Sequence, residues 1–135
     1  MANSNEEFPR SEKFEKGLRT RREVLGDDYV DRSLGAVDAL GWPMQQLVTE
    51  YCWDEIWNRP GLDRRSRSLL NLGMIAALNR THELRAHVRG AINNGVTTQE
   101  LCEVFLQVAV YCGFPAALDG WRTAREVLKE LGCDE

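Results

Sequence analysis

Helical periodicity interrupted by strong stop signals is the feature of this sequence that most limits its fold. Apolar residues recur every three or four positions, and no stretch has the Val, Ile and Thr alternation typical of a β-strand. Glycine, proline or a capping residue closes each segment. The pattern predicts an all-α fold, a compact single-domain subunit of about six helices. Taken one by one, seven segments have helical character: 11–25, 28–40, 43–57, 64–78, 81–93, 98–111 and the stretch from a break at 113–115 to residue 131.

Residues at the ends of these segments fit the geometry of helix caps. Asp63 follows the turn signal of residues 58–61 and is placed to accept a hydrogen bond from the first turn of the next helix. Thr97 and Glu100 have the spacing of a capping box, in which each side chain bonds to the backbone amide of the other residue. Pro43 is expected in the first turn of its helix, where its missing amide hydrogen does no harm. These signals predict where three helices begin.

The helix predicted at 98–111 is apolar on most of its circumference, with the sequence LCEVFLQVAVYC from residue 101 to 112. A helix that is apolar all round has to be buried on nearly all sides. A subunit of 135 residues offers few such places. We therefore expect this helix to pack against other subunits.

Size and charge point to an ordinary globular protein. A chain of 135 residues is expected to form one domain, residues 1–135, with 43% hydrophobic and 28% charged residues. The net charge of −4 gives no electrostatic reason to expect nucleic acid or an anionic membrane as partner. The N-terminal residues lack the apolar core of a secretory signal, and the most apolar stretch, 105–118, is too short to cross a bilayer. The sequence predicts a cytoplasmic protein with no transmembrane helix.

The four cysteines form no CxxC pair. Without a secretory signal we expect reduced thiols, with Cys102 and Cys112 in a helix core and Cys133 in the tail. A zinc site is not expected, because the two histidines have no cysteine close to them in sequence.

Glu83 and His87 are the first candidates for chemistry, since residues four apart share a helical face. His87 lies near the edge of the apolar stripe and is predicted to be half-buried, whereas His82 points away from it. A neighbouring carboxylate is expected to raise the pKa of His87, which suits a proton donor near neutral pH. A surface Glu–His pair or a hydrogen-bonded core histidine is the alternative interpretation.

Arginines are concentrated in the middle of the chain. Seven lie between residues 59 and 89, where there is no lysine. Arginine holds carboxylates through two parallel hydrogen bonds, so the group indicates an anionic substrate. For any single arginine, a solvated helix face or an intersubunit salt bridge is the alternative. The candidates for substrate binding are Arg64, Arg67, Arg80 and Arg85.

An aromatic cluster precedes the turn at residues 58–61. It contains Tyr51, Trp53 and Trp57, and such residues most often lie in a core or an interface. Trp53 is a candidate for contact with the substrate. Cys52 is a weak candidate for a nucleophile, because no histidine lies just before it in the sequence.

Four long stretches, in the same order, resemble the carboxymuconolactone decarboxylase family and cover almost the whole chain. They are GLRTRREVLGDDYVDRSL (17–34), YCWDEIWNRPGLDRRSRSLLNLGMIAALNR (51–80), HELRAHVRGAINNGV (82–96) and AVYCGFPAALDGW (109–121). The resemblance implies an all-helical alkylhydroperoxidase-D-like fold, assembled into homotrimers or hexamers with active sites at subunit contacts. It also implies conversion of 4-carboxymuconolactone to an enol-lactone of 3-oxoadipate in protocatechuate degradation, the β-ketoadipate pathway of aromatic compound catabolism.

Such a reaction requires no cofactor, because the substrate's own lactone carbonyl accepts the electrons left by the departing carboxylate. We expect His87 to donate a proton or to bind the developing oxyanion, with Glu83 setting its orientation and charge. The four candidate arginines would bind the carboxylates. Related decarboxylases act on other lactones or polyketide acids, and the family commonly has a histidine near the position of Tyr51, so a related substrate is an alternative.

The wider superfamily also contains thiol peroxidases with a C-x-x-C-x-x-x-H motif. Aligned on His87, this motif would need cysteines at Arg80 and Glu83, and its associated glutamate falls on Ser68. Neither a thiolate nor its resolving partner is in place, which disfavours redox chemistry. A peroxidase that uses Cys52, or a non-catalytic protein that keeps the fold, are the other hypotheses.

Overall fold

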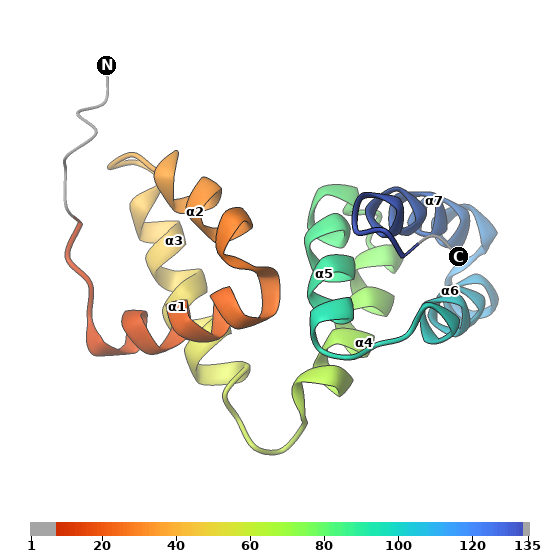
Figure 1. Ribbon diagram of the computed structural model, residues 1–135, viewed down its shortest axis with the longest axis horizontal. Helices are drawn as coiled ribbons and strands as arrows, with labels where there is room; N and C mark the ends of the chain where they lie inside the picture. The colour runs from red at the N-terminus through yellow and green to blue at the C-terminus, as the bar shows by residue number, and fades with distance from the viewer. Residues whose placement is uncertain (1–7, 134–135) are drawn as a thin grey trace. The chain divides into compact units, whose positions relative to one another are not determined.

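The computed structural model describes residues 8–133, and these residues form helices and no strand, so the predicted all-α class is confirmed. The chain divides into two compact units, Met1–Gly61 and Leu62–Glu135, which are described separately (Figure 1). The prediction of one domain over residues 1–135 stays a prediction. In chain order the described elements are α1 (Glu12–Leu25), α2 (Asp27–Gly35), α3 (Trp42–Leu47), the π-helix η1 (Val48–Ile56), α4 (Arg64–Ala77), α5 (Thr81–Asn93), α6 (Thr98–Cys112) and α7 (Phe114–Glu130).

The N-terminal unit is built on a close contact between α1 and η1. Ser11 caps α1 by accepting a hydrogen bond from the backbone nitrogen of Phe14 at 3.0 Å. Gly17 lies so near η1 that a Cβ atom built on it would stand 2.0 Å from the carbonyl oxygen of Thr49. Only glycine allows the two backbones to approach this far.

The segment predicted as one helix over 43–57 changes its hydrogen-bonding pattern halfway. After the short α3, residues Val48–Ile56 form a π-helix, and the backbone nitrogen of Trp57 donates to Cys52 oxygen, five residues back, at 3.0 Å. A helix was expected here, but periodicity alone does not distinguish these two windings in a segment this short.

The second helix ends earlier than predicted. The sequence predicts a helix over 28–40, whereas α2 stops at Gly35 and Leu40 is 91% exposed. The carboxylate of Asp38 accepts a hydrogen bond from the backbone nitrogen of Gly41 at 2.8 Å. Asp competes in this way with the helical hydrogen bonds, which explains the turn before α3.

The C-terminal unit consists of α4 to α7 around one apolar core. Its fully buried members include Leu72, Leu84, Val88, Leu101 and Val127, so every helix of the unit contributes. α5 packs against both α4 and α7, and α6 packs against the same two helices. This arrangement fixes the position of α5, which carries the Glu83–His87 pair.

The predicted caps of this unit are confirmed. The carboxylate of Asp63 accepts a hydrogen bond from Ser66 nitrogen at 2.7 Å at the start of α4. Thr97 and Glu100 form both hydrogen bonds of a capping box at the start of α6, at 3.0 and 3.1 Å. The second oxygen of Glu100 also pairs with the guanidinium of Arg65.

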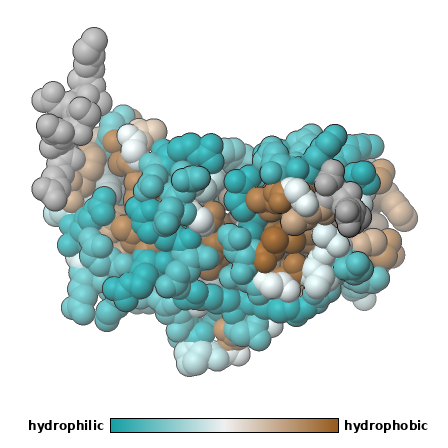
Figure 2. All heavy atoms as spheres, viewed as in Figure 1, coloured by the Kyte–Doolittle hydropathy of each residue, from teal (hydrophilic) through white to brown (hydrophobic). Residues whose placement is uncertain are grey.

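The outer face of α6 is exposed within a single chain, and the expected packing of this helix against other subunits stays a prediction. Val110 is 72% and Tyr111 80% exposed, while the opposite face enters the core through Leu101 and Phe105. Figure 2 shows apolar residues in brown at the surface of this unit, including the right edge where α6 and α7 are joined.

The expected core positions of Cys102 and Cys112 are also wrong. Both side chains are exposed on α6, because each lies on a side of the helix that points away from the core. The four cysteines are free thiols, and Cys133 is half-buried. Among residues 8–133, no helix has both the length and the apolar character that crossing a bilayer requires.

Candidate active site

His87 and Glu83 lie one turn apart on α5, as the spacing predicts. Only 9% of His87 is exposed, so it is more deeply buried than the predicted half-burial. Glu83 stands in the exposed first turn of the helix. His82 is exposed on another side of the same helix. The carboxylate of Glu83 therefore lies on the solvent side of the buried imidazole.

Asn71 on α4 is the residue of this site that sequence reasoning missed. Its side-chain nitrogen lies 3.5 Å from Nδ1 of His87. One signal was present in the sequence, because Arg64, Arg67 and Asn71 are spaced three and four apart and therefore share a face of α4. An isolated asparagine in an otherwise apolar stretch marks a polar contact on that face.

A second polar contact joins the same two helices. Asn94, at the end of α5, donates to the hydroxyl of buried Ser68 on α4 at 2.9 Å. Buried polar side chains are costly unless they are hydrogen-bonded. The contacts at Ser68 and Asn71 thus fix α4 and α5 in one register, which holds the His87 ring against α4.

Burial lowers the pKa of His87 below its ordinary value of 6.5, and the nearby charge of Glu83 opposes this without overcoming it. The prediction of a raised pKa is therefore wrong. The carboxylate acts in the expected direction, but removing the imidazolium from water has the larger effect. At neutral pH the side chain is a neutral imidazole.

The contact with Asn71 bears on where the proton of this imidazole lies. The side-chain nitrogen of Asn71 is an amide donor 3.5 Å from Nδ1 of His87, and donation to Nδ1 places the ring proton on Nε2. A neutral imidazole held in this way presents an N–H donor at Nε2. That group suits an oxygen on which negative charge develops.

The candidate arginines occupy different positions. Arg64 and Arg67 are half-buried on the face of α4 that bears Asn71. Arg80 is the exposed N-cap residue of α5 and lies seven residues before His87, which places both on about the same face of the helix. These three arginines therefore lie on the two helix faces that form the Asn71–His87 contact.

Arg85 is not brought together with His87. It lies about 200° around α5 from that residue. Its guanidinium binds the carboxylates of Glu126 at 2.7 Å and Glu130 at 2.5 Å on α7, and Arg89 also binds Glu130 at 3.0 Å. In the structure Arg85 ties α5 to α7.

Trp53 belongs to the N-terminal unit and is buried. Its indole stacks on that of Trp57, with ring centroids 4.9 Å apart and an interplanar angle of 19°. Cys52 beside it is half-buried. Within the described part of the chain, no cluster of three or more His, Cys, Asp or Glu side chains is arranged to hold a metal ion.

Comparison with known proteins shows that residues 43–126 match the carboxymuconolactone decarboxylase family. A nitrosuccinic acid decarboxylase from Metarhizium robertsii is 42% identical over 118 residues, which cover 87% of this chain and 82% of that protein. A 4-carboxymuconolactone decarboxylase from Acinetobacter baylyi is 41% identical over 121 residues, 90% of each chain.

Proposed function

Because the chain belongs to the carboxymuconolactone decarboxylase family and is a decarboxylase, a carbon–carbon lyase, we propose that its substrate is 4-carboxymuconolactone or a closely related carboxylated lactone. The product is then the enol-lactone of 3-oxoadipate, formed during protocatechuate degradation. The observation that carries the proposal is buried His87 with Asn71 at Nδ1, a neutral donor suited to an enolate oxygen.

The proposed reaction breaks one carbon–carbon bond. The departing carboxylate is attached to a carbon that is conjugated through an alkene to the lactone carbonyl. Carbon dioxide leaves, and the electron pair of the broken bond moves onto the carbonyl oxygen to form a dienolate. A proton then adds to carbon, so a carboxylate and a proton become carbon dioxide and a C–H bond. The protein has to bind carboxylates, stabilise the dienolate oxygen and let a proton reach carbon.

In this proposal His87 stabilises the oxygen through Nε2–H. A neutral donor fits this task better than an imidazolium acid, because burial disfavours the charged form of the ring. Glu83 moderates the pKa of His87, and Asn71 fixes its tautomer. Removal of one such donor from an enzyme typically lowers kcat about 10²–10³-fold.

The carboxylates of the substrate are assigned to Arg64, Arg67 and Arg80. Each stands on the same helix face as Asn71 or His87, and a guanidinium can hold a carboxylate through two hydrogen bonds. Arg85 lies about 200° around α5 from His87 and binds two carboxylates of α7 there, so we do not assign it to the substrate. Trp53 stays a candidate for contact with the substrate ring.

The names of the two relatives bear directly on the choice of substrate. Nitrosuccinic acid and 4-carboxymuconolactone each have a carboxylate whose loss leaves an electron pair that is conjugated with an electron-withdrawing group. An oxygen that gains negative charge is common to both cases, on a nitro group or on a lactone carbonyl. The same Nε2–H donor therefore serves either substrate.

Release of carbon dioxide from each substrate, without added thiol, tests the proposal. We expect turnover of the carboxylated lactone with a kcat/KM well above that for nitrosuccinic acid. A higher kcat/KM for nitrosuccinic acid would show that the substrate is a nitro acid and not a carboxylated lactone. Consumption of peroxide with a dithiol, in place of carbon dioxide release, would contradict decarboxylation by this chain.

We predict that Glu83→Gln shifts the acid limb of the pH–rate profile to lower pH and changes kcat little at pH 7. The substitution removes the charge that raises the pKa of His87, so the ring stays neutral further into acid. The profile of kcat against pH, with an NMR titration of the imidazole, measures both effects. Glu15→Gln, in the exposed first turn of α1, is the matched control. A large loss of kcat at pH 7 would favour an imidazolium donor instead.

The lowered pKa of His87 also predicts that the folded chain becomes less stable as the pH falls. Because the pKa of His87 is lower in the folded chain than its ordinary value of 6.5, protonation favours the unfolded state. This contribution to stability is fully present above pH 6.5 and is lost as the pH falls through the folded value.

We also propose that the subunit assembles into homotrimers or hexamers through the exposed face of α4 and α6. An apolar groove of about 740 Å³ lies there, between Leu70, Met74, Val104, Val108 and Tyr111. Apolar patches of this kind mark protein interfaces. The proposal agrees with the apolar sequence of α6, because a second copy of the chain would bury the apolar side chains that are exposed in one chain.

Met74→Glu is expected to shift the protein toward monomers. Met74 is 53% exposed in the groove, and a buried, unpaired carboxylate would oppose association. Light scattering coupled to size-exclusion chromatography gives the molar mass directly. Leu40→Glu, at a residue that is 91% exposed in the N-terminal unit, should leave the mass unchanged. A native mass for Met74→Glu would place the interface elsewhere.

A further inference from the structure

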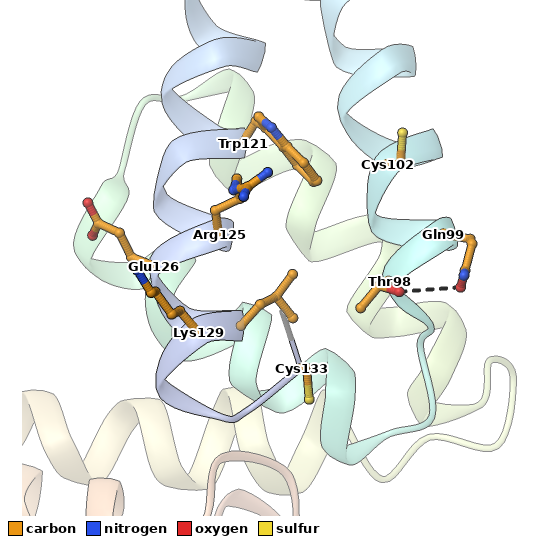
Figure 3. Close-up of a pocket in the computed structure, with 9 residues that line it drawn as sticks. Thr98, Gln99, Cys102, Trp121, Arg125, Glu126, Lys129 and Cys133 are labelled. Atoms are coloured by element: carbon orange, nitrogen blue, oxygen red, sulfur yellow. Dashed lines mark hydrogen bonds between the residues drawn. The ribbon is translucent and has the colours of Figure 1, made fainter. Parts of the chain in front are cut away.

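A pocket between α6 and α7 lies outside the residues assigned to decarboxylation. Its volume is about 650 Å³, within the range of small-molecule sites. Figure 3 shows side chains from the start of α6 and from the last turns of α7 around it, together with Cys133. The residues that line it are Thr98, Gln99, Cys102, Trp121, Arg125, Glu126, Leu128, Lys129 and Cys133. Neither Asn71 nor His87 is among them.

One wall of the pocket combines an aromatic ring with two cations. Trp121, Arg125 and Lys129 follow one another at intervals of four residues, so they form a row along α7. The guanidinium carbon of Arg125 lies 6.0 Å from the centroid of the Trp121 ring. Within residues 8–133, no ion pair engages Arg125 or Lys129.

The acidic residues of α7 do not neutralise this wall. Glu126 also lines the pocket, but its carboxylate binds Arg85 of α5 at 2.7 Å. Glu130 binds Arg85 and Arg89 on the same side. The helix thus directs Glu126 and Glu130 to α5, and its two uncompensated cations line the pocket. In a chain with a net charge of −4, this is a local excess of positive charge.

Beyond the cations, Leu128 and the thiols of Cys102 and Cys133 give the pocket apolar surface, and Thr98 and Gln99 add polar side chains. Next to it is a smaller recess of about 200 Å³ that shares Cys102 and Trp121 and is otherwise lined by apolar side chains such as Phe105 and Ala117. A ligand held here meets apolar surface on the side of the indole and positive charge at Arg125 and Lys129.

We propose that this pocket binds a small aromatic carboxylate. The ring of the ligand stacks against the Trp121 indole, and its carboxylate lies between Arg125 and Lys129. Guanidinium and ammonium groups supply charge-assisted hydrogen bonds, and the indole supplies the face for stacking. A bare inorganic anion would leave the aromatic wall unused, and an uncharged aromatic ring would leave the cations unused.

Benzoate is the probe for this site, with acetate and benzyl alcohol as the matched compounds that lack the ring or the charge. We expect saturable binding of benzoate by calorimetry and much weaker binding of the other two. Arg125→Gln should weaken benzoate binding about tenfold, the loss expected for one charge-assisted hydrogen bond. Arg122→Gln, one turn away and paired with Asp119 at 3.2 Å, is the control and should bind benzoate normally.

The cysteines supply a second readout that needs no variant. Benzoate should protect Cys102 and Cys133 from a thiol reagent and leave the reaction rate of Cys112, which lies outside the pocket, unchanged. His87→Ala should bind benzoate as the native chain does, because the pocket is separate from the catalytic residues. Equal binding by Arg125→Gln, equal affinity for acetate, or loss of binding in His87→Ala would each overturn the proposal, while decarboxylation itself is measured independently.

Discussion

His87→Ala is expected to lower kcat for decarboxylation by about 10²–10³-fold, the largest effect on activity of any single substitution in this chain. The side chain is buried on α5, its ring is held by Asn71, and its pKa is depressed. The variant loses the Nε2–H donor that the proposed mechanism directs at the dienolate oxygen. Carbon dioxide release under saturating substrate measures the loss.

His82→Ala is the matched control, because His82 lies on the same helix but is exposed. It should keep full activity. Circular dichroism and the molar mass in solution distinguish a lost donor from a lost fold. His87→Gln adds a sharper comparison, since an amide N–H can still donate a hydrogen bond but cannot act as an imidazolium acid. Native activity in His87→Ala would remove His87 from the mechanism.

Gly17→Ala is expected to destabilise the protein by about 3 kcal/mol or more, at the upper end of what overpacking costs. The added Cβ would stand 2.0 Å from the carbonyl oxygen of Thr49 and 3.1 Å from the backbone nitrogen of Asp54. Both are backbone atoms of η1, so no side chain can rotate away to make room. The free energy of unfolding, measured with chemical denaturant, reports the effect.

Gly35→Ala is the control for this prediction. It lies at the end of α2 in the same unit, and nothing stands within 4 Å of a Cβ built on it. Alanine has the higher helix propensity, so the free energy of unfolding should stay the same or rise slightly. A Gly17→Ala variant as stable as Gly35→Ala would mean that α1 and η1 can separate at little cost.

The helix boundaries that the sequence predicted correctly are those set by local chemistry. Asp63 and the Thr97–Glu100 capping box act within one turn of chain, and a pattern of neighbouring residues describes them fully. The π-helix and the early end of α2 were missed. The π-helix packs against Gly17, 31 or more residues earlier, and the turn after α2 contains a hydrogen bond that the carboxylate of Asp38 accepts from the backbone nitrogen of Gly41.

The same division holds for the candidate site. Helical spacing correctly placed Glu83 and His87 together, because both lie on one helix. It gave the wrong sign for the pKa of His87, since burial depends on what the rest of the fold brings around the ring. Likewise, the partners of Arg85 on α7 are 41 and 45 residues away, and the Asn71 contact crosses from one helix to another.

Glu100 links the first turn of α6 to the start of α4. One oxygen of its carboxylate completes the capping box of α6, and the other pairs with Arg65 near the start of α4. Fraying of the first turn of α6 would therefore also release its contact with α4. The two helix starts are thermodynamically coupled, so hydrogen exchange at these amides should report one shared opening event instead of two separate ones.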